Sequence, residues 1–522
     1  MPKKTATSES TETKKISTEQ RVYCLTRLED IKEDGTKETL ISTPEQIAVA
    51  IAKCSRSDAP FDQNLREVSL ENAASFHEKW VVGYGHGSVA EHAVGSVALE
   101  RISQVVIKIL EDSRLASYTE KSSRYVVFTR DLVVIPEALK KGEIAQRVEA
   151  YLDRLYNLYD DIQNAVRPLM TSRFPKTEDM PDRAYEATTK ARVCDVARYT
   201  LPAAAAGNLG MTANARVWAH VITKLASSPH QEAQDLAKTL IAKLRLSDGE
   251  TPDEALKNRL FPTLLKYAGY NDYQATLPKK LKNLAENILK ATEDQATQAD
   301  AETPVIITKD DSHAELHIAS ALLARHSKKP IGTIQTYLQN HPEQIKEIIL
   351  SAVEERGDHD QLPREFEHAT FQHEIVMDYG AWRDVQRHRM CSQLNQELGV
   401  DLGYVMPYEI REVGLEHAYR SMMNDAKRLH TELCARGLYA EAEYIVPMAY
   451  RRRLIVTWNL RELDHFITLR SGKKGHPSYR KIAQETWRTL EATHPILASI
   501  IRVDMSGNEE GVSTLGAKPK GF

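Results

Sequence analysis

The sequence is poor in cysteine. Its 522 residues include five, and no two of them have the C-x-x-C spacing of a redox or zinc motif. They lie far apart, at Cys24, Cys54, Cys194, Cys391 and Cys434. An odd and scattered set does not form a disulfide framework. We therefore expect a protein of the reducing cytoplasm with neither structural disulfides nor a bound metal.

Long hydrophobic runs are also missing. The best stretch, residues 89–110, is interrupted by Glu91, Glu100, Arg101 and Lys108, whereas a membrane helix needs about 18 uninterrupted apolar residues. The first residues lack the apolar segment of a secretory signal. The net charge of −4 gives no basic surface along the whole chain. We expect neither a membrane nor a nucleic acid as partner.

What the sequence does contain is the composition of a globular protein, with 42% hydrophobic and 27% charged residues. Helical periodicity dominates residues 44–264, and strand patterns occur at 125–128, 132–135 and 305–308, which predicts a helix-rich mixed α/β protein. Polar stretches divide the chain into a disordered tail at 1–17, a first body at 18–278, a linker at 279–304, a second body at 305–505 and a loose tail at 506–522.

Three short motifs occur twice, in the same order, at offsets of 276, 275 and 245 residues. The pairs are Glu91-His92 with Glu367-His368, Arg114 and Ser117 with Arg389 and Ser392, and Pro202, Asn214 and Arg216 with Pro447, Asn459 and Arg461. Each match is short, but the matches are collinear. They predict a diverged tandem duplication whose second copy is about 30 residues shorter in its middle.

The first motif runs from His86 to His92 and precedes an apolar pattern of helical type. Ser88 and Glu91 have the S-x-x-E spacing of a capping box, so we expect a helix to begin here. The two histidines are six residues apart and do not share a helix face, which argues against a helical metal pair.

Cationic and polar residues gather in four other places. The loop at 114–125 combines two arginines, a glutamate and several hydroxyls, a set that suits a phosphate. The run at 387–389, Arg-His-Arg, can surround a pyrophosphate only at the end of an element. The triple arginine at 451–453 is expected to be a solvated turn. Residues 459–470 fit one helix whose two ends share a face. Taken singly, each also fits an ordinary solvated surface.

Together these elements resemble the flavin-dependent thymidylate synthases, whose motifs are H-x-S-x-x-E-H, R-H-R-x7-S followed by R-Y, an Arg before a Pro, and N-x-R with an Arg 11 residues after the Asn. The first body matches at His86, Ser88, Glu91, His92, Ser117, Glu120, Ser122, Arg124, Tyr125, Arg198, Asn214 and Arg216. The second matches at Arg387, His388, Arg389, Ser392, Asn459, Arg461 and Arg470. The resemblance covers about residues 45–240 and 315–490.

The departures from the family pattern are largely reciprocal. The first body has Asp112-Ser113-Arg114 in place of R-H-R, and Leu225 in place of the final Arg. In the second body Leu362 and Arg364 replace the opening His and Ser. Glu397 replaces the Ser of the loop, and Glu443 replaces the Arg before Pro. We therefore hypothesise that each pair of bodies forms one active hybrid site. The complementary site, built from the positions at which each body has lost the family residues, would be inactive. The hybrid site would combine His86, Ser88, Glu120, Ser122, Arg124 and Arg198 with Arg387, His388, Arg389, Asn459, Arg461 and Arg470.

The resemblance implies an α+β fold with two tandem modules, each helix-rich with a mainly antiparallel sheet, and a homodimer that assembles four modules. It implies reductive methylation of dUMP to dTMP, with FAD as cofactor and with NADPH and methylenetetrahydrofolate as co-substrates. It assigns Glu120, Ser122, Arg124, Arg198 and Arg470 to dUMP, with Arg470 as the catalytic group that polarises the uracil. It assigns His86, Ser88, Asn214, Arg216, Arg387, His388, Arg389, Asn459, Arg461 and His465 to the flavin.

Three alternatives stay open from the sequence. The altered loop at 395–404 allows an enzyme with a different nucleotide or methylene donor. The motif losses also fit a catalytically degenerate flavin- or nucleotide-binding homologue. A structural or RNA-binding scaffold is disfavoured by the near-neutral charge.

Overall fold

The computed structural model describes residues 25–31, 37–83, 85–245, 258–290 and 304–506. The predicted tail at 1–17, all but the first residue of the tail at 506–522 and the second half of the predicted linker lie outside the described residues. Helix α10 (Asp272–Leu289) reaches into the first half of that linker. The boundaries proposed for the two bodies stay predictions.

The chain divides into two compact units. The smaller contains Met1–Gly95, Asn214–Arg216 and Ala242–Tyr267, and the larger contains Ser96–Ala213, Val217–Ile241 and Ala268–Phe522. The smaller unit holds β1 (Arg27–Ile31), β2 (Lys37–Ile41), α1 (Pro44–Lys53), α2 (Phe61–Arg66), α3 (Leu70–Phe76), the π-helix η1 (His77–Gly83) and the 3-10 turn η2 (Val89–Glu91). Helix α1 begins at a capping box, in which Thr43 and Gln46 each accept a hydrogen bond from the other's backbone N–H.

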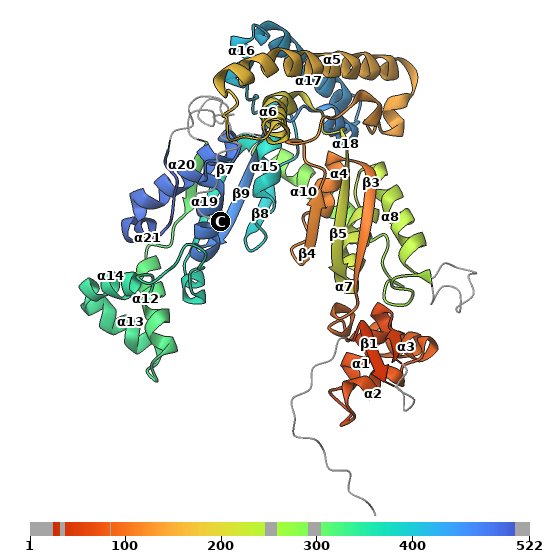
Figure 1. Cartoon of the computed structure of the whole chain (residues 1–522), viewed down its shortest axis with the longest axis vertical. Helices are drawn as coiled ribbons and strands as arrows, with labels where there is room; N and C mark the ends of the chain where they lie inside the picture. The colour runs from red at the N-terminus through yellow and green to blue at the C-terminus, as the bar shows by residue number, and fades with distance from the viewer. Residues whose placement is uncertain (1–24, 32–36, 84, 246–257, 291–303, 507–522) are drawn as a thin grey trace, which may run out of the picture. The chain divides into compact units, whose positions relative to one another are not determined.

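The larger unit contains two antiparallel sheets, one from each half of the chain (Figure 1). The first has strand order β3-β5-β4 and the second has order β6-β7-β9-β8. The first half supplies β3 (Val94–Ser103), α4 (Gln104–Leu110), β4 (Ala116–Glu120), η3 (Arg130–Leu132), η4 (Glu137–Lys140), α5 (Gly142–Arg173), α6 (Asp182–Ala197), η5 (Arg198–Thr200), β5 (Ala206–Asn214), α7 (Ala215–Ala226) and α8 (Gln231–Leu244).

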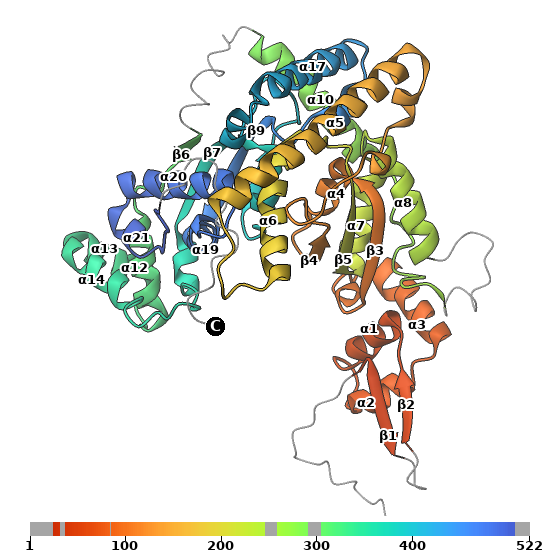
Figure 2. The same cartoon turned by 45° about the horizontal axis from the view of Figure 1, so that its top comes forward.

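The second half repeats this order with additions at its start. It supplies β6 (Val305–Lys309), α12 (Ala314–Arg325), α13 (Ile331–Asn340), α14 (Pro342–Ser351), η6 (Arg364–His368), β7 (Thr370–Asp378), α15 (Tyr379–Val385), β8 (Ser392–Asn395), α16 (Tyr408–Glu412), α17 (Glu416–Ala435), α18 (Tyr439–Ala442), η7 (Glu443–Ile445), β9 (Arg451–Asn459), α19 (Leu460–Ser471), α20 (Pro477–Thr493) and α21 (Pro495–Ser499). Helices α5 and α17, one from each half, lie side by side in both views (Figures 1 and 2).

The predicted duplication is confirmed by the strand registers. In the first sheet Ser117 of β4 lies opposite Thr212 of β5, and in the second Ser392 of β8 lies opposite Thr457 of β9. These pairs are related by the offsets of 275 and 245 found in the sequence. Helices α4 and α15 also begin at equivalent positions, each after a side-chain N-cap.

The two halves meet through a symmetric pair of backbone hydrogen bonds. Ala203 N donates to Val446 O at 2.9 Å, and Met448 N donates to Leu201 O at 2.8 Å. At the offset of 245, Met448 corresponds to Ala203 and Val446 corresponds to Leu201. The halves of one chain therefore contact each other about a local two-fold axis, in the way that two identical subunits do.

Two of the three predicted strands are wrong, and a strand was missed. Residues 305–308 form β6 as predicted. Residues 125–128 instead form a loop, in which the backbone N–H of the buried Phe128 donates to Tyr159 Oη of α5. Residues 132–135 make only one β-bridge, Val133 with Ala205. The stretch 94–103, expected to be helical, is strand β3 because it pairs with β5.

The triple arginine at 451–453 is not a solvated turn, which corrects the prediction. It opens β9, where alternate residues face the core. Arg452 is buried, with its guanidinium 4.1 Å from the centroid of the Trp382 ring. Arg453 Nε lies 3.1 Å from Glu374 Oε1 on the neighbouring strand β7. A basic run at a strand start thus supplies one buried cation and one cross-strand ion pair.

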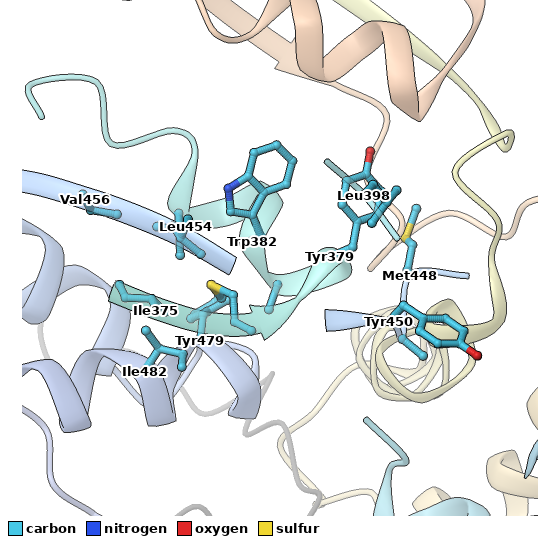
Figure 3. Packing of buried hydrophobic residues seen from close by; sticks show 14 of the residues in the cluster. Ile375, Tyr379, Trp382, Leu398, Met448, Tyr450, Leu454, Val456, Tyr479 and Ile482 are labelled. Atoms are coloured by element: carbon cyan, nitrogen blue, oxygen red, sulfur yellow. The ribbon is translucent and has the colours of Figure 1, made fainter. Parts of the chain in front are cut away.

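One continuous hydrophobic core runs through both halves of the larger unit. Its second-half part packs Ile375 of β7, Leu454 and Val456 of β9 and Ile482 of α20 against one another (Figure 3). Among the described residues, no helix is both long enough and apolar enough to cross a bilayer.

Candidate active site

A buried carboxylate with three cations marks the junction of the two halves. Glu120, at the end of β4, is ion-paired with Arg383 of α15, its Oε2 is 3.0 Å from Lys108 Nζ, and the Arg387 guanidinium is 3.6 Å away. The Glu120 side chain is 1% exposed. Burial opposes its ionisation, but the Arg383 and Lys108 charges outweigh burial and lower the pKa of Glu120 to about 2. The carboxylate is ionised and holds the two halves together.

The Arg-His-Arg run lies just past the end of α15, which meets the condition that it stand at the end of an element. Its first member, Arg387, is 47% exposed. Its third, Arg389, donates to the Arg114 carbonyl at 3.1 Å, and Arg114 donates to Ser392 Oγ at 3.1 Å. Arg114 and Arg389 are equivalent residues of the two copies, so the two versions of this motif face each other across the local two-fold.

Arg124 is fixed by a carboxylate on a second element. Its Nε and Nη2 donate to the two oxygens of Asp195 of α6, at 2.7 and 2.9 Å, and its Nη1 donates to Tyr479 Oη of α20 at 3.2 Å. Although Arg124 is largely buried, the Asp195 charge raises its pKa above the ordinary value. Ser122 is close by, because its Oγ accepts from the Arg124 N–H at 3.2 Å. Arg124 therefore has a fixed orientation toward the second half of the chain.

Arg470 and His388 form a chain of polar contacts that ends on the same tyrosine. Arg470 Nε donates to His388 Nε2 at 3.0 Å, and its guanidinium lies 5.4 Å from the Tyr479 ring centroid. Burial lowers the pKa of His388, so its ring is neutral with an acceptor at Nε2. The Nδ1–H then donates to Glu462 Oε1 at 3.2 Å. Arg470 Nη1 is also 3.7 Å from Asp384 Oδ1.

Arg198 is the least satisfied cation of this region. It begins the 3-10 turn η5 and is 2% exposed. Its Nε and Nη2 are buried and have no hydrogen-bond partner among the residues that the structure describes. A buried N–H without an acceptor costs about 1–3 kcal/mol, and more for a charged group. The Arg198 guanidinium therefore has hydrogen-bond donors that no described residue uses.

The helix at 459–470 is confirmed as α19, but its predicted flavin residues already have partners. Asn459 caps the helix by accepting from Glu462 N at 2.9 Å. Arg461 Nη1 donates to Glu367 Oε1 at 2.9 Å. His465 is exposed, and its ring is tilted by 54° to that of His388, with centroids 5.3 Å apart.

The smaller unit carries the other predicted flavin residues. His86 and Ser88 line a cavity of about 500 Å³ together with Trp80, whose ring is 6.1 Å from that of His86. The expected capping box is absent, because Ser88 makes no side-chain cap bond. Glu91 instead accepts from Arg216 Nη1 at 2.5 Å.

The pairing of Glu91 with Arg216 matches the pairing of Glu367 with Arg461 in the second copy. This repeated ion pair joins the Glu of the Glu-His pair to the Arg of N-x-R in both copies. Asn214 and Arg216 both belong to the smaller unit.

The larger unit thus brings together the predicted residues of both halves that it contains. Around one junction lie Glu120, Ser122, Arg124, Arg387, His388, Arg389 and Arg470, connected by the contacts given above. Sequence reasoning missed Lys108, Asp195, Arg383, Asp384 and Tyr479. Lys108 and Arg383 could have been found, because they are both cations and are related by the offset of 275.

The residues present fit a flavin in two respects. The half-exposed Arg387 offers a guanidinium next to a fixed, neutral His388, and guanidinium forks suit a pyrophosphate. The cavity lined by Trp80 and His86 offers aromatic faces beside a hydroxyl from Ser88, which suits a planar polar ring.

Comparison with known proteins gives the family. A family model described as thymidylate synthase complementing protein matches residues 38–247 and 306–496. A UPF0159 protein of Chlamydia pneumoniae is 30% identical over 449 residues, which cover 82% of this chain and 80% of the relative. A flavin-dependent thymidylate synthase of Clostridium tetani (strain Massachusetts / E88) is 24% identical over 240 residues, which cover 45% of this chain and 86% of the relative.

Among solved structures, the UMP/dUMP methylase PolB from Streptomyces cacaoi, bound with 5-Br dUMP, is similar at 16% identity. The match covers 38% of this chain and 93% of that chain, with a TM-score of 0.30. The two segments matched by the family model include both sheets and the paired motifs of both copies. The chain therefore belongs to the flavin-dependent thymidylate synthase family, with the family's module duplicated in tandem and partly degenerate.

Proposed function

We propose that this chain is an FAD-dependent thymidylate synthase that methylates dUMP to dTMP, with methylenetetrahydrofolate as carbon donor and NADPH as reductant. The observation that carries the proposal is Arg198, a buried guanidinium with two unpartnered N–H donors. It lies in the first copy, at the family's position for a substrate-binding arginine, while the cations that the first copy has lost are retained in the second. The proposed substrate site is a hybrid of the two copies.

The phosphate of dUMP is proposed to bind Arg198 and Arg124. A dianionic phosphate supplies the acceptors that Arg198 lacks, and each charge-assisted hydrogen bond contributes about 1.5–3 kcal/mol. Arg124 is already oriented by Asp195, and its Nη1, now directed at Tyr479, faces away from that carboxylate and is proposed to donate to the ligand. Ser122 adds a hydroxyl next to the Arg124 backbone.

Arg470 is proposed to act on the uracil ring. Its guanidinium is held by His388 and lies beside Tyr479, the same side chain that Arg124 contacts. A fixed positive group near N3 stabilises negative charge that develops on the ring. Because His388 is neutral, it holds Arg470 without adding a competing charge.

FAD, when bound, supplies the hydride-carrying chemistry. In this proposal Arg387 and Arg389 donate to its phosphates, and His388 positions Arg470 beside the substrate. His86, Ser88 and the aromatic wall of their cavity are proposed to bind the flavin ring. Asn459, Arg461, Asn214, Arg216 and His465 are proposed as supporting residues, with the two repeated Glu–Arg pairs fixing the loops that carry them. A homodimer with four modules is the proposed assembly.

The second candidate function is flavin or nucleotide binding without synthase activity. The observation that favours it is the engagement of Arg124, whose bidentate bond to Asp195 neutralises a cation that the substrate needs. The two functions differ in turnover and not in binding, so a turnover assay separates them.

The experiment is tritium release from 5-labelled dUMP by the purified full-length chain supplied with FAD, NADPH and methylenetetrahydrofolate. We expect release by the wild type, and loss of release in Arg198→Ala. Arg488→Ala is the matched control, because this exposed arginine of α20 forms an ion pair with Glu485 one turn away. A protein that binds flavin but releases no tritium supports the second candidate, and a protein that binds neither flavin nor dUMP contradicts both.

A further inference from the structure

Glu462, in the first turn of α19, holds a carboxylate oxygen against the buried ring of His388. Its Oε1 lies 3.2 Å from His388 Nδ1, and the Glu462 and His388 side chains are 9% and 2% exposed. The backbone N–H of Glu462 donates to Asn459 Oδ1 at 2.9 Å, which fixes the start of the helix. The helix dipole favours negative charge at this end. A buried acceptor is therefore held in place on one side of the imidazole.

The contacts of the His388 ring determine which of its two nitrogens carries the proton. Nδ1 faces the Glu462 carboxylate, which accepts hydrogen bonds, and Nε2 lies 3.0 Å from Arg470 Nε, which donates. Burial lowers the pKa of His388, so the neutral ring offers one donor and one acceptor. Only the tautomer with the proton on Nδ1 satisfies both neighbours. With the proton on Nε2, two N–H donors would face each other at Arg470.

The orientation of Arg470 depends on this ring and on one carboxylate. Phe466 of α19 is completely buried and lies edge-on to His388, with ring centroids 5.1 Å apart and planes 87° apart, so the imidazole has a fixed plane. Arg470 Nη1 also lies 3.7 Å from Asp384 Oδ1. Two side chains thus orient the guanidinium, Asp384 directly and His388 in the tautomer that Glu462 sets.

The duplication shows that these residues form a group. The first copy has apolar or uncharged residues at all four corresponding positions, at offsets of 275 and 245. Asp384, His388, Glu462 and Arg470 correspond to Ile109, Ser113, Val217 and Leu225. The first copy has therefore lost the final arginine together with both side chains that orient it and with the carboxylate that faces the histidine.

A neighbouring ion pair of the same helix behaves differently. Arg461, the residue before Glu462, pairs with Glu367, and the first copy keeps this pair as Arg216 with Glu91. Contacts that serve the fold are thus present in both copies. Glu462 is present only in the copy that keeps His388 and Arg470, which indicates a role at the site and not in the helix.

We propose that Glu462 is a positioning residue, which accepts the Nδ1–H of His388 and so fixes the tautomer whose Nε2 orients Arg470. This rests on the proposed function, because Arg470 is the group proposed to stabilise charge on the uracil. A misoriented guanidinium keeps its charge but no longer places it where charge develops in the transition state. The effect is expected on kcat and not on the KM of dUMP, whose phosphate is proposed to bind Arg124 and Arg198.

The kinetic test compares Glu462→Gln with Glu462→Leu by tritium release from 5-labelled dUMP. The glutamine oxygen still accepts from His388 Nδ1, so we expect kcat within about threefold of the wild type. Leucine has no acceptor. With it we expect kcat to fall about 10–100-fold, the usual cost of removing a carboxylate that orients a functional histidine, and the KM of dUMP to change by less than about threefold.

Asp464→Asn is the matched control for this comparison. Asp464 is a buried carboxylate of the same helix and forms an ion pair with Arg356. Its replacement removes a buried charge two residues from Glu462 without touching His388. We expect a lower free energy of unfolding, with kcat within about threefold of the wild type because the Arg470 contacts are unchanged.

The tautomer is measured by NMR of the full-length chain labelled with ¹⁵N-histidine. Long-range ¹H–¹⁵N correlations distinguish a protonated ring nitrogen from an unprotonated one, and the spectrum of His388→Gln identifies the His388 signals by their absence. We expect the proton on Nδ1 in the wild type, Glu462→Gln and Asp464→Asn, and loss of this single state in Glu462→Leu. This measurement does not depend on turnover.

Three results overturn the proposal. These are a proton on His388 Nε2 in the wild type, equal kcat in Glu462→Leu and Glu462→Gln, and a loss of kcat in Asp464→Asn as large as that in Glu462→Leu. Near-ultraviolet circular dichroism checks the fold of each variant, and if Glu462→Leu does not fold, the wild-type spectrum decides. A wild type without tritium release but with the proton on Nδ1 contradicts the proposed function alone. Release with the proton on Nε2 contradicts this inference alone.

Discussion

Replacing Glu120 with glutamine is expected to destabilise the junction between the two halves of the chain. Glu120 is the only carboxylate for which the described structure gives contacts with Lys108, Arg383 and Arg387 together. Glutamine has nearly the same shape, so the change removes the charge without opening a cavity. The buried Arg383 then loses its carboxylate partner, whereas Lys108 keeps its ion pair with Glu111, so the change leaves the Arg383 charge uncompensated in the core.

Two lines of reasoning give the size of this effect. Removing one partner of a buried ion pair typically costs about 3–5 kcal/mol. Independently, the pKa of Glu120 is lowered from 4.5 to about 2, a difference that corresponds to roughly 3 kcal/mol. Because the pKa in the folded chain is below that in the unfolded chain, this stabilisation is present above pH 4.5 and is lost as the pH falls toward 2. We therefore expect a loss of about 3 kcal/mol at pH 7.

The assay is urea unfolding followed by tryptophan fluorescence, at pH 7 and at steps from pH 5 to pH 3. Glu120→Gln should unfold at lower urea than the wild type at pH 7, and the difference should shrink as the pH falls. Glu137→Gln is the control, because Glu137 is 69% exposed and forms an ion pair with Lys140 on the same turn. The reasoning is refuted if Glu120→Gln unfolds at the same urea concentration as Glu137→Gln.

Three further predictions concern other parts of the chain. Arg198→Ala should raise the dissociation constant for dUMP roughly 10–100-fold, the value of a charge-assisted hydrogen bond, whereas calorimetry should detect no change in Arg488→Ala. Trp458→Ala should lower the free energy of unfolding by about 3–5 kcal/mol, because this indole is 1% exposed in the core; a midpoint equal to the wild type would contradict the packing described. Burial raises the pKa of Glu45 to about 6, so its contribution to stability is full below pH 4.5 and is lost as the pH rises past 6. Amide-exchange protection of Thr263, whose N–H donates to Glu45, should fall over that range in the wild type and stay level in Glu45→Gln.

The duplication could be predicted from sequence because insertions do not disturb the spacing within each motif group. The offsets of 275 and 245 reappear as strand register, with Ser117 opposite Thr212 and Ser392 opposite Thr457. Strand β3 could not be predicted in this way. Its pattern runs without a break into the helix α4 that follows, and it becomes a strand through pairing with β5, about a hundred residues further along the chain.

The candidate site was predicted through its motif residues and not through their partners. The bond from Arg124 to Asp195 spans 71 residues, and that from Arg124 to Tyr479 spans 355. No local spacing encodes contacts of this length. The first arises from the fold of the first half, and the second arises when the two halves pack about the local two-fold. Arg452 was misread for a related reason. A run of three arginines is read as exposed unless the neighbouring strand and the ring of Trp382 are known.

The central claim is that one catalytic site takes residues from both halves of the chain. Its most direct test is the rate of tritium release from 5-labelled dUMP by Arg198→Ala, in the first half, and by Arg470→Ala, in the second. The account predicts release by the wild type and a loss of at least about 100-fold in each variant, the size expected when a fixed charge at a transition state is removed. A rate near that of the wild type in either variant would contradict the claim.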